Sequence, residues 1–139
     1  MKEDSNIFII DTSAILTYIE DEDGAAYVEN LLIEAEKGDV FIHIAFISLT
    51  EVFYITAREQ NEAAALERLK LIQSLTIQVH ESYENFNIDA GKLKANNNIS
   101  IADAYIAALC YKLKGILAHK DPEYEKLSSL IKEYRLPYK

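Results

Sequence analysis

NIFIIDTSAIL, residues 6–16, decides the fold, because it places a short apolar strand directly before an acid and the start of a helix. Asn6–Ile10 carries an apolar run of the kind found in strands buried on both faces of a parallel sheet. Asp11 ends this run, and the Thr-Ser pair behind it favours a helix that continues through Tyr18. The segment predicts a strand–helix unit with a carboxylate at the carboxyl end of the strand.

Three further acids occupy similar places, where predicted strands give way to helices. Their contexts are ISLTEVFYI around Glu51, SIADAYIAA around Asp103 and LAHKDPEY around Asp121. Because the carboxyl ends of parallel strands meet at one edge of a sheet, we expect these acids to gather there with Asp11. Gathered carboxylates repel one another, and oxygen-only ligand sets suit Mg²⁺ or Mn²⁺. The pattern therefore favours a metal-dependent phosphodiesterase.

The remaining segments alternate between strands and helices. We expect strands at Val40–Ala45, Thr76–His80, Ile116–Ala118 and Ile131–Tyr138, and helices at Ala25–Lys37, Ser48–Glu59, Glu62–Ser74, Glu84–Ala95, Ile101–Lys114 and from Asp121-Pro122 onward. The helices at Ser48–Glu59 and Glu62–Ser74 are expected to form a hairpin joined near Gln60-Asn61. This order predicts a single domain over residues 1–139, an α/β three-layer α/β/α sandwich with a mostly parallel central sheet.

The amino-acid composition limits which partners and which cellular compartment we expect. Half of the 139 residues are hydrophobic, which suffices for the core of one domain. The net charge of −9 argues against bulk electrostatic capture of nucleic acid and favours a basic protein partner. The single cysteine, Cys110, lies in an apolar stretch, so we expect a buried thiol in a reducing, cytoplasmic compartment. We expect no signal peptide in the polar segment MKEDSN and no membrane association.

Other common site types lack their motifs. His43, His80 and His119 are far apart in the chain and lack the local pairing of a zinc motif. The sequence contains neither the G-x-S-x-G pattern of serine hydrolases nor a glycine-rich phosphate loop. A receiver-like or phosphatase-like α/β protein would place paired acids directly after its first strand, where Asp11 stands alone.

Each acid also has a purely structural explanation. Ser48-Leu-Thr-Glu51 has the pattern of a capping box, and Ser100-Ile-Ala-Asp103 is the aspartate version of it. Asp121 before a proline suits an N-cap, and Asp11 can cap the helix that follows it. Capping does not require all of these acids to converge on one edge. It is also compatible with catalysis, because a helix N-terminus orients the side chain that caps it.

The order of these motifs resembles that of the PIN-domain nucleases, and in particular the VapC-type toxins of type II toxin–antitoxin pairs. The resemblance extends from FIIDTS to the terminal strand and includes SLTEV, IADAYIAA and the final Asp-Pro. It implies a PIN-like fold and a Mg²⁺- or Mn²⁺-dependent endoribonuclease. By the same resemblance, the catalytic and metal-binding acids are Asp11, Glu51, Asp103 and Asp121.

Three residues near these acids are candidate auxiliaries. Thr12 and Ser13 stand where the resembling family has a small hydroxyl residue beside its first aspartate. His119 departs from that pattern, because the family usually has Thr or Ser two residues before the last aspartate. His119 can bind phosphate, reach a metal through water, or change the activity or its pH optimum. The alternative is a half-exposed histidine at a strand end.

The resemblance also implies partners. They are an RNA substrate, a small antitoxin with a basic tail, and a second copy of the chain that pairs through the helical hairpin. Candidates for phosphate contacts are Arg58, Lys92, Lys94 and Lys120. The rival interpretation is a catalytically inactive PIN-fold binding module that holds a basic partner, and metal affinity distinguishes the two.

Overall fold

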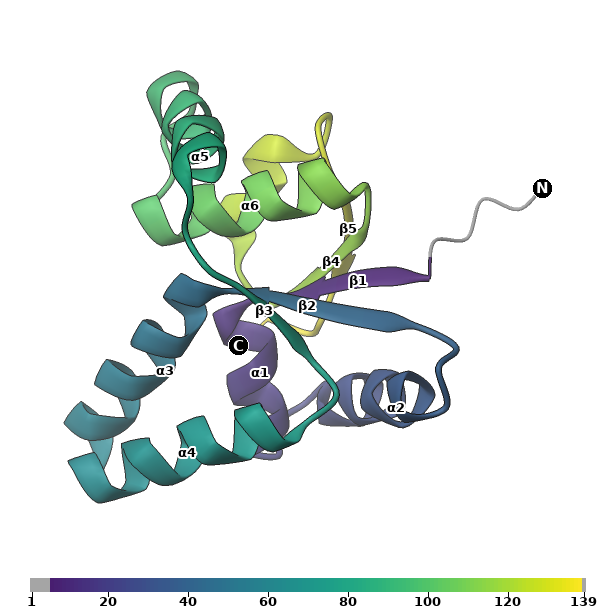
Figure 1. The fold of residues 1–139 in the computed structure, drawn as a ribbon, viewed down its shortest axis with the longest axis vertical. Coiled ribbons are helices and arrows are strands. Elements are labelled where there is room, and N and C mark those ends of the chain that lie inside the picture. The colour runs from purple at the N-terminus through teal and green to yellow at the C-terminus, as the bar shows by residue number, and fades with distance from the viewer. Residues whose placement is uncertain (1–5, 139) are drawn as a thin grey trace.

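The computed structural model describes residues 6–138 and has helices on both faces of a central sheet (Figure 1). The strands are β1 (Ile7–Ile10), β2 (Phe41–Ala45), β3 (Gln78–His80), β4 (Ile116–His119) and β5 (Lys132–Arg135). The helices are α1 (Thr12–Ile19), α2 (Ala25–Glu36), α3 (Phe46–Glu59), α4 (Glu62–Ser74), α5 (Glu84–Asn96), α6 (Ile101–Leu113) and the short 3₁₀ helix η1 (Pro122–Leu127). The predicted three-layer α/β/α sandwich is confirmed.

The strand order places the carboxyl ends of β1 and β4 beside each other. The sheet has the order β3-β2-β1-β4-β5, and every neighbouring pair is parallel. From β1 the chain first builds outward through β2 and β3, and it then returns to add β4 on the other side of β1. Ligands of open parallel sheets bind at such a reversal, outside the carboxyl ends of the strands. The topology therefore directs attention to the residues that follow β1 and β4.

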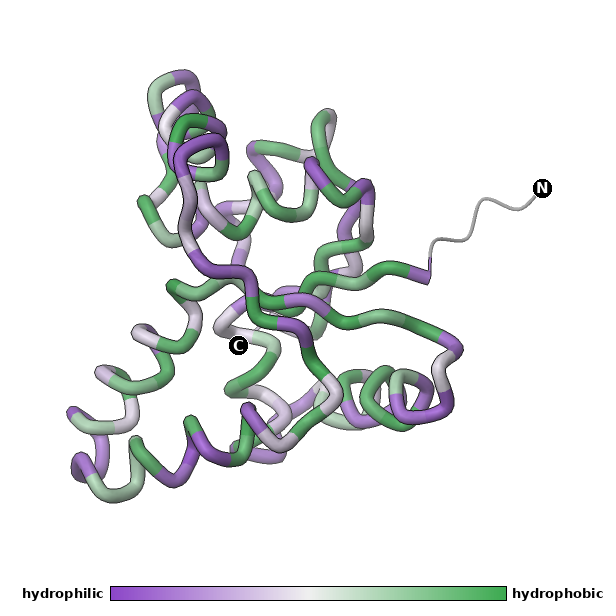
Figure 2. The backbone as a smooth tube through the Cα atoms, in the orientation of Figure 1, coloured by the Kyte–Doolittle hydropathy of each residue, from purple (hydrophilic) through white to green (hydrophobic). Residues whose placement is uncertain are grey.

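The core lies on both faces of β1, as its continuous apolar sequence predicts. Ile9 packs with residues of α5 and α6 on one face, whereas Ile10 packs with residues of α1 and α2 on the other. Figure 2 shows hydrophobic residues along β1 and β2, and both hydrophobic and hydrophilic turns along the helices. Cys110 is buried on α6, as expected from its apolar surroundings. A sheet covered in this way holds the strand ends rigidly.

The predicted helical hairpin is confirmed by α3 and α4, which run antiparallel beside each other (Figure 1). The side chain of Asn61 begins α4 by accepting a hydrogen bond from the backbone N–H of Ala64 at 2.8 Å. Arg68 on α4 donates to Glu20 at 2.9 Å and to Thr56 on α3 at 3.1 Å. These bonds attach the hairpin to the end of α1. A role of the hairpin in dimerisation stays a prediction.

Several element boundaries differ from those expected from sequence. Helix α3 begins at Phe46, so Ser48 lies inside its first turn and is not an N-cap. The last strand is limited to Lys132–Arg135, and the last helix is a 3₁₀ turn. Propensity locates such short terminal elements poorly, because tertiary contacts determine where they end.

The described part of the chain contains no helix that is long and apolar enough to cross a membrane. The segment in which we expect no signal peptide includes residues 1–5, which lie outside the described residues.

Candidate active site

Asp11 stands at the reversal of the sheet, directly after β1. Its backbone N–H donates to the carbonyl of Ala118 on β4 at 3.2 Å. Its Oδ1 accepts the backbone N–H of Ala14 at 2.8 Å, so Asp11 is the N-cap of α1, as the sequence allowed. The side chain is nevertheless only 2 % exposed. A capping carboxylate at this depth is held in one orientation by the protein.

Ser13 connects Asp11 to the segment that follows β4. Its Oγ donates to the Asp11 carboxylate, lying 2.7 Å from Oδ1 and 2.8 Å from Oδ2. The same Oγ accepts the backbone N–H of Lys120 at 2.9 Å. One hydroxyl therefore orients the first acid and fastens it to the neighbouring strand end.

Glu51 reaches this edge from α3, and Thr12 holds it. The Thr12 hydroxyl donates to Glu51 Oε1 at 2.5 Å and lies 3.0 Å from the buried hydroxyl of Ser48. Ser48 and Glu51 are three residues apart on α3, so both face α1. The predicted capping box at Ser48 is wrong, because the Ser48 hydroxyl bonds to Thr12 on another helix.

Asp103 enters the edge from the first turn of α6. Ser100 caps this helix as predicted, because its Oγ accepts the backbone N–H of Asp103 at 3.1 Å. The Asp103 carboxylate does not complete a capping box. It accepts the hydroxyl of Tyr124 at 2.9 Å, and the backbone N–H of Ser100 instead donates to Glu123 at 3.2 Å. The aspartate is 7 % exposed and faces the strand ends.

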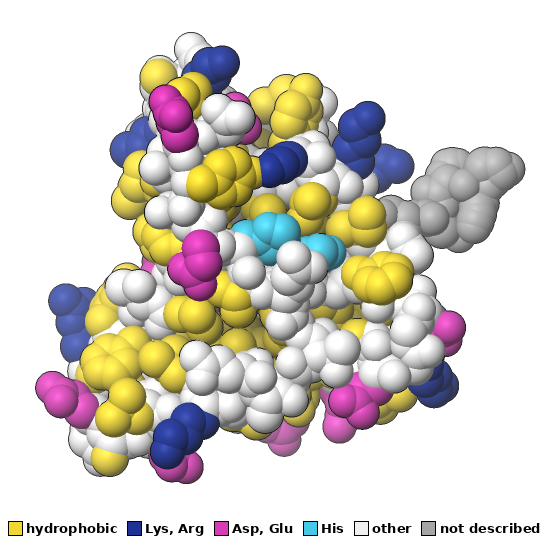
Figure 3. Space-filling view, viewed as in Figure 1, with side chains coloured by type: hydrophobic (Ala, Val, Ile, Leu, Met, Phe, Trp, Pro, Cys, Tyr) yellow, Lys and Arg dark blue, Asp and Glu magenta, His cyan; other side chains and the backbone are white. Residues whose placement is uncertain are grey.

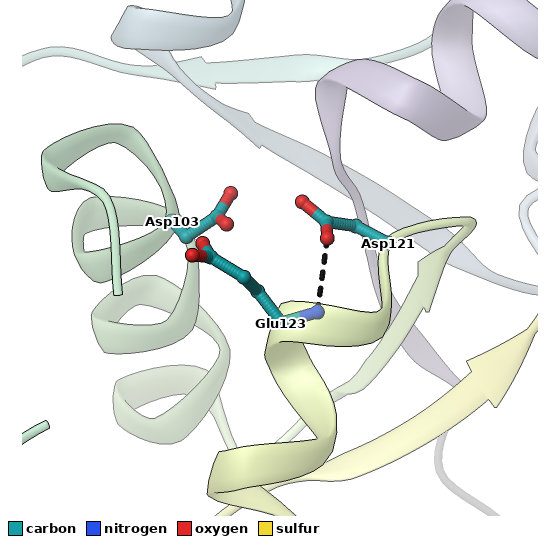
Figure 4. Close-up of side chains that lie close together, drawn as sticks. All are labelled: Asp103, Asp121 and Glu123. Atoms are coloured by element: carbon teal, nitrogen blue, oxygen red, sulfur yellow. Dashed lines mark hydrogen bonds between the residues drawn. The ribbon is translucent and has the colours of Figure 1, made fainter. Parts of the chain in front are cut away.

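Three carboxylates converge beside β4, as Figure 4 shows: Asp103 from α6 faces Asp121 and Glu123 from the other side. One oxygen of each side chain lies within 4.8 Å of an oxygen of the other two. Asp121 caps η1 by accepting the backbone N–H of Glu123 at 2.9 Å. The sequence prediction missed Glu123. The signal was the acid two residues after Asp121, but only the tight 3₁₀ turn directs it back toward Asp103.

The electrostatics of this edge disfavour charge on its buried acids. Burial raises the pKa of Asp11 to about 7, despite the hydrogen bonds from Ser13 and Ala14, and the charges of Asp121 and Glu51 add to the rise. Burial, followed by the neighbouring Glu123 and Asp121, raises the pKa of Asp103 as well. The pKa of Glu123 is lowered, chiefly by the hydrogen bond with Asp103. The pKa values of these two facing acids are therefore shifted in opposite directions, upward for Asp103 and downward for Glu123.

His119 supports the segment that carries Asp121. It is fully buried, so the expectation of a half-exposed histidine is wrong. Its Nδ1 accepts the backbone N–H of Asp121 at 3.0 Å, which leaves the proton on Nε2, 2.7 Å from Glu133 Oε1. Arg135 donates to the same Glu133 oxygen at 3.1 Å. Both ring nitrogens are thus occupied by protein groups.

A groove of about 500 Å³ opens beside the acidic edge. Its lining includes Ser13 and Lys120, together with the acids Glu20, Glu22 and Glu59. Lys120 was a candidate for a phosphate contact, but its Nζ lies 3.5 Å from Glu22 and its side chain is 5 % exposed. The acids of the groove suit a basic segment better than they suit an anion.

The side chains at this edge fit a hard divalent cation. The donors at the cluster are all carboxylate oxygens, the ligand type that Mg²⁺ and Mn²⁺ prefer. Burial, and after it the neighbouring carboxylates, raise the pKa values of Asp11 and Asp103, so a bound cation would offset a charge that this edge disfavours. Asp103, Asp121 and Glu123 could hold such an ion, and Asp11 interacts electrostatically with both Asp121 and Glu51.

Comparison with known proteins relates the chain to one family. The sequence model of the family described as the PIN domain matches residues 8–130. No curated protein matches the chain significantly. Its fold is similar to VapBC2 of Rickettsia felis, solved on a promoter DNA fragment, with a TM-score of 0.75 and 18 % identity over 94 % of this chain and 99 % of that one.

Two further toxin structures share the fold. VapBC-1 of Haemophilus influenzae aligns with a TM-score of 0.68 and 20 % identity, over 93 % of this chain and 97 % of that one. VapC20 of Mycobacterium tuberculosis, described as a toxin that cleaves the sarcin–ricin loop, aligns with a TM-score of 0.71 and 15 % identity, over 92 % of this chain and 98 % of that one. At these identities the likeness shows the fold alone.

Proposed function

The chain belongs to the PIN-domain family, and from this premise we propose that it is a metal-dependent endoribonuclease, the toxin of a type II toxin–antitoxin pair. The observation that carries the proposal is the convergence of Asp103, Asp121 and Glu123 at the reversal of a parallel sheet, next to Asp11. PIN nucleases generally use divalent metals, and this edge offers the matching oxygen donors. The rival interpretation, an inactive binding module, is not favoured, because His119 leaves these carboxylates together.

The acids have two proposed roles, which are to bind a cation and to form the wall of the pocket. Asp11 and Asp103 are proposed as principal ligands, with Asp121 and Glu123 beside them, and Glu51 completes the acidic wall. A bound Mg²⁺ or Mn²⁺ supplies polarisation of a phosphoryl oxygen and a lowered pKa of the attacking water. No side-chain nucleophile is needed, so the phosphodiester is hydrolysed without a covalent intermediate.

The remaining polar residues position these acids. Ser13 fixes both oxygens of Asp11, Thr12 fixes Glu51, and the Tyr124 hydroxyl fixes Asp103. His119 holds the backbone of Asp121. Thr12, Ser13 and His119 are therefore positioning residues in this proposal. Because the acids are already oriented by the protein, ligand binding requires little rearrangement.

A basic antitoxin segment is the proposed protein partner. The comparison structures from R. felis and H. influenzae are described as VapBC complexes, and the present chain has a net charge of −9. The groove beside Ser13 carries Glu20 and Glu59, and it opens next to the carboxylate edge. An Arg- or Lys-rich tail lying there would mask the catalytic acids. The same proposal includes a cytoplasmic location, a single domain over residues 1–139, and dimerisation through α3 and α4.

The test is cleavage of structured RNAs, including tRNA and ribosomal fragments, by purified protein with Mg²⁺, Mn²⁺ or EDTA. Asp103→Asn should abolish cleavage while the protein stays folded, because the amide oxygen still accepts the Tyr124 hydrogen bond and the buried side chain carries no charge. Asp89→Asn, at an exposed acid on α5, is the matched control and should remain active. Full activity of Asp103→Asn would refute the assignment, and Mn²⁺ binding without cleavage of any RNA would favour the inactive binding module.

A further inference from the structure

Two histidines meet on the sheet away from the acidic edge. His43 lies on β2 and His80 on the neighbouring parallel strand β3. Nδ1 of His43 is 2.8 Å from Nε2 of His80, and the ring centroids are 5.0 Å apart. The register pairs His43 with Gln78 and Ala45 with His80, so both histidines project from the same face of the sheet. Their distance along the chain hides this pairing from sequence motifs.

The pair is open to solvent. Both side chains are half-buried, whereas His119 is fully buried. Figure 3 shows histidine side chains side by side at the surface, where Figure 1 has β2 and β3 crossing the centre of the same view. Since β3 is the edge strand of the sheet, molecules in solution can approach the two rings directly.

The two rings are held in their neutral form. The pKa of His43 is lowered by burial and by the proximity of His80. The pKa of His80 is lowered by burial and by the positive charge of Lys112 on α6. When two neutral imidazoles form a hydrogen bond, one of the facing nitrogens donates its N–H and the other accepts it with its lone pair. Neutral imidazole is also the form that binds metal ions.

We infer that His43 and His80 form a two-imidazole binding site for a borderline transition-metal ion such as Zn²⁺, Cu²⁺ or Ni²⁺. Two nitrogens bound to one tetrahedral zinc at 2.0–2.1 Å lie roughly 3.3 Å apart. The facing nitrogens therefore need to separate by about half an ångström, and both rings need to turn so that their lone pairs point at the ion. The ring that donates in the free protein moves its proton to its other nitrogen. The ion then takes the place of that proton, and no net proton is released from the neutral pair.

Ligand chemistry separates this site from the carboxylate edge. Imidazole favours zinc, copper and nickel, whereas carboxylates favour magnesium and manganese. Within residues 6–138, no third histidine, cysteine or acid lies close enough to join the histidine pair. Water therefore completes the coordination, and the site is weaker and more exchangeable than a structural site with four protein ligands.

Lys112 provides an internal probe of the site. Its Nζ lies over the Tyr83 ring at 4.5 Å from the centroid, and its charge acts on His80. A nearby ammonium group repels a bound cation. Removing that charge should therefore tighten metal binding without touching either proposed ligand.

The experiment is calorimetric titration of the full chain with Zn²⁺, in excess Mg²⁺ so that the carboxylate edge is occupied. We expect one Zn²⁺ per chain, and each of His43→Gln and His80→Gln should weaken its binding at least about tenfold. Asp103→Asn should leave this zinc affinity unchanged, and Lys112→Gln should increase it. Imidazole proton resonances of the two histidines should shift on zinc addition.

Opposite results are equally informative. Zinc binding that survives both histidine substitutions, or that disappears in Asp103→Asn, would assign the ion to the carboxylates and overturn the inference. Absence of zinc binding by the unmodified protein would overturn it as well. Because no step depends on RNA cleavage, failure of the proposed nuclease activity would leave this result standing.

Discussion

The acidic edge has two halves that are built differently. In the β1 half, Asp11 and Glu51 are each held by a hydroxyl group from α1. In the β4 half, Asp103, Asp121 and Glu123 lie within 4.8 Å of one another. Their donors there are the Tyr124 hydroxyl and backbone N–H groups.

The difference indicates how the edge divides its tasks. Hydrogen-bond donors stabilise a buried carboxylate and fix its direction, as they do in the β1 half. In the β4 half, burial and then the facing carboxylates raise the pKa of Asp103, which shows that negative charge on this acid is disfavoured. A cation offsets that repulsion most where the acids are most crowded. We therefore expect the β4 half to contribute most to cation binding, with Asp11 joining it from the β1 half, where hydrogen bonds already fix its direction.

The largest effect that tests this comparison is the pH dependence of stability in metal-free protein. The pKa of Asp11 is raised from 3.8 to about 7 in the folded state, and that of Asp103 is also raised. The folded protein therefore retains protons on these two acids that the unfolded chain releases. Their contribution to stability is fully present below about pH 4 and is lost as the pH rises through their folded pKa values, about 7 for Asp11 and about 9 for Asp103. Urea unfolding should show a loss on the order of a few kcal/mol between pH 5 and pH 8.

Magnesium separates the contributions of the two halves. Bound Mg²⁺ should recover most of the stability lost at pH 8, because it replaces the protons on the buried acids. The recovery should persist in Glu51→Gln and be much smaller in Asp121→Asn. Stability that is independent of pH in the metal-free protein would show that these acids are not strained, and the comparison would fail.

The next effect concerns His119, which accepts the backbone N–H of Asp121 in the β4 half. His119→Thr should destabilise the protein by about 1–3 kcal/mol, because the backbone N–H of Asp121 loses its acceptor and Glu133 loses one of its two donors. Mg²⁺ affinity should fall with it, since Asp121 loses its fixed position. Thermal unfolding and Mg²⁺ titration measure the two effects.

Glu133→Gln is the matched control for His119. The amide oxygen still accepts from Nε2, so the His119 ring and the Asp121 backbone should stay in place and Mg²⁺ affinity should change little. If His119→Thr binds Mg²⁺ as well as the unmodified protein does, His119 is a packing residue only.

The smallest expected effect is that of Glu123→Gln. If Glu123 is a metal ligand, removing its charge should weaken Mg²⁺ binding about tenfold, which corresponds to about 1.4 kcal/mol. The Gln oxygen can still accept the backbone N–H of Ser100, so the start of α6 should be unaffected. Unchanged affinity would restrict the role of Glu123 to capping α6 and would leave Asp11, Asp103 and Asp121 as the proposed ligands.

Much of the fold followed from the sequence. An apolar run such as Asn6–Ile10 suits only a strand that is buried on both faces, and Ser100 and Asn61 mark helix starts through local hydrogen bonds. The positions of Asp11 and Asp121 followed as well, because each comes directly after such a strand or caps the helix behind it. These signals depend on neighbours within a few residues, so they can be recognised from the sequence alone. The assignment of catalytic roles to these acids stays a prediction.

Tertiary structure decided which side chains meet. Glu123 joins Asp103 because a 3₁₀ turn redirects it, and Ser48 contacts Thr12 because α3 begins earlier than its propensities suggest. His43 and His80 become neighbours only when β3 adds to β2 in one particular register. A shift of one residue would turn one ring to the opposite face of the sheet. The sequence by itself determined where the strands lie, where helices such as α6 begin, and the order of the acids. Contacts between distant side chains depend on register and helix position, which only long-range packing sets.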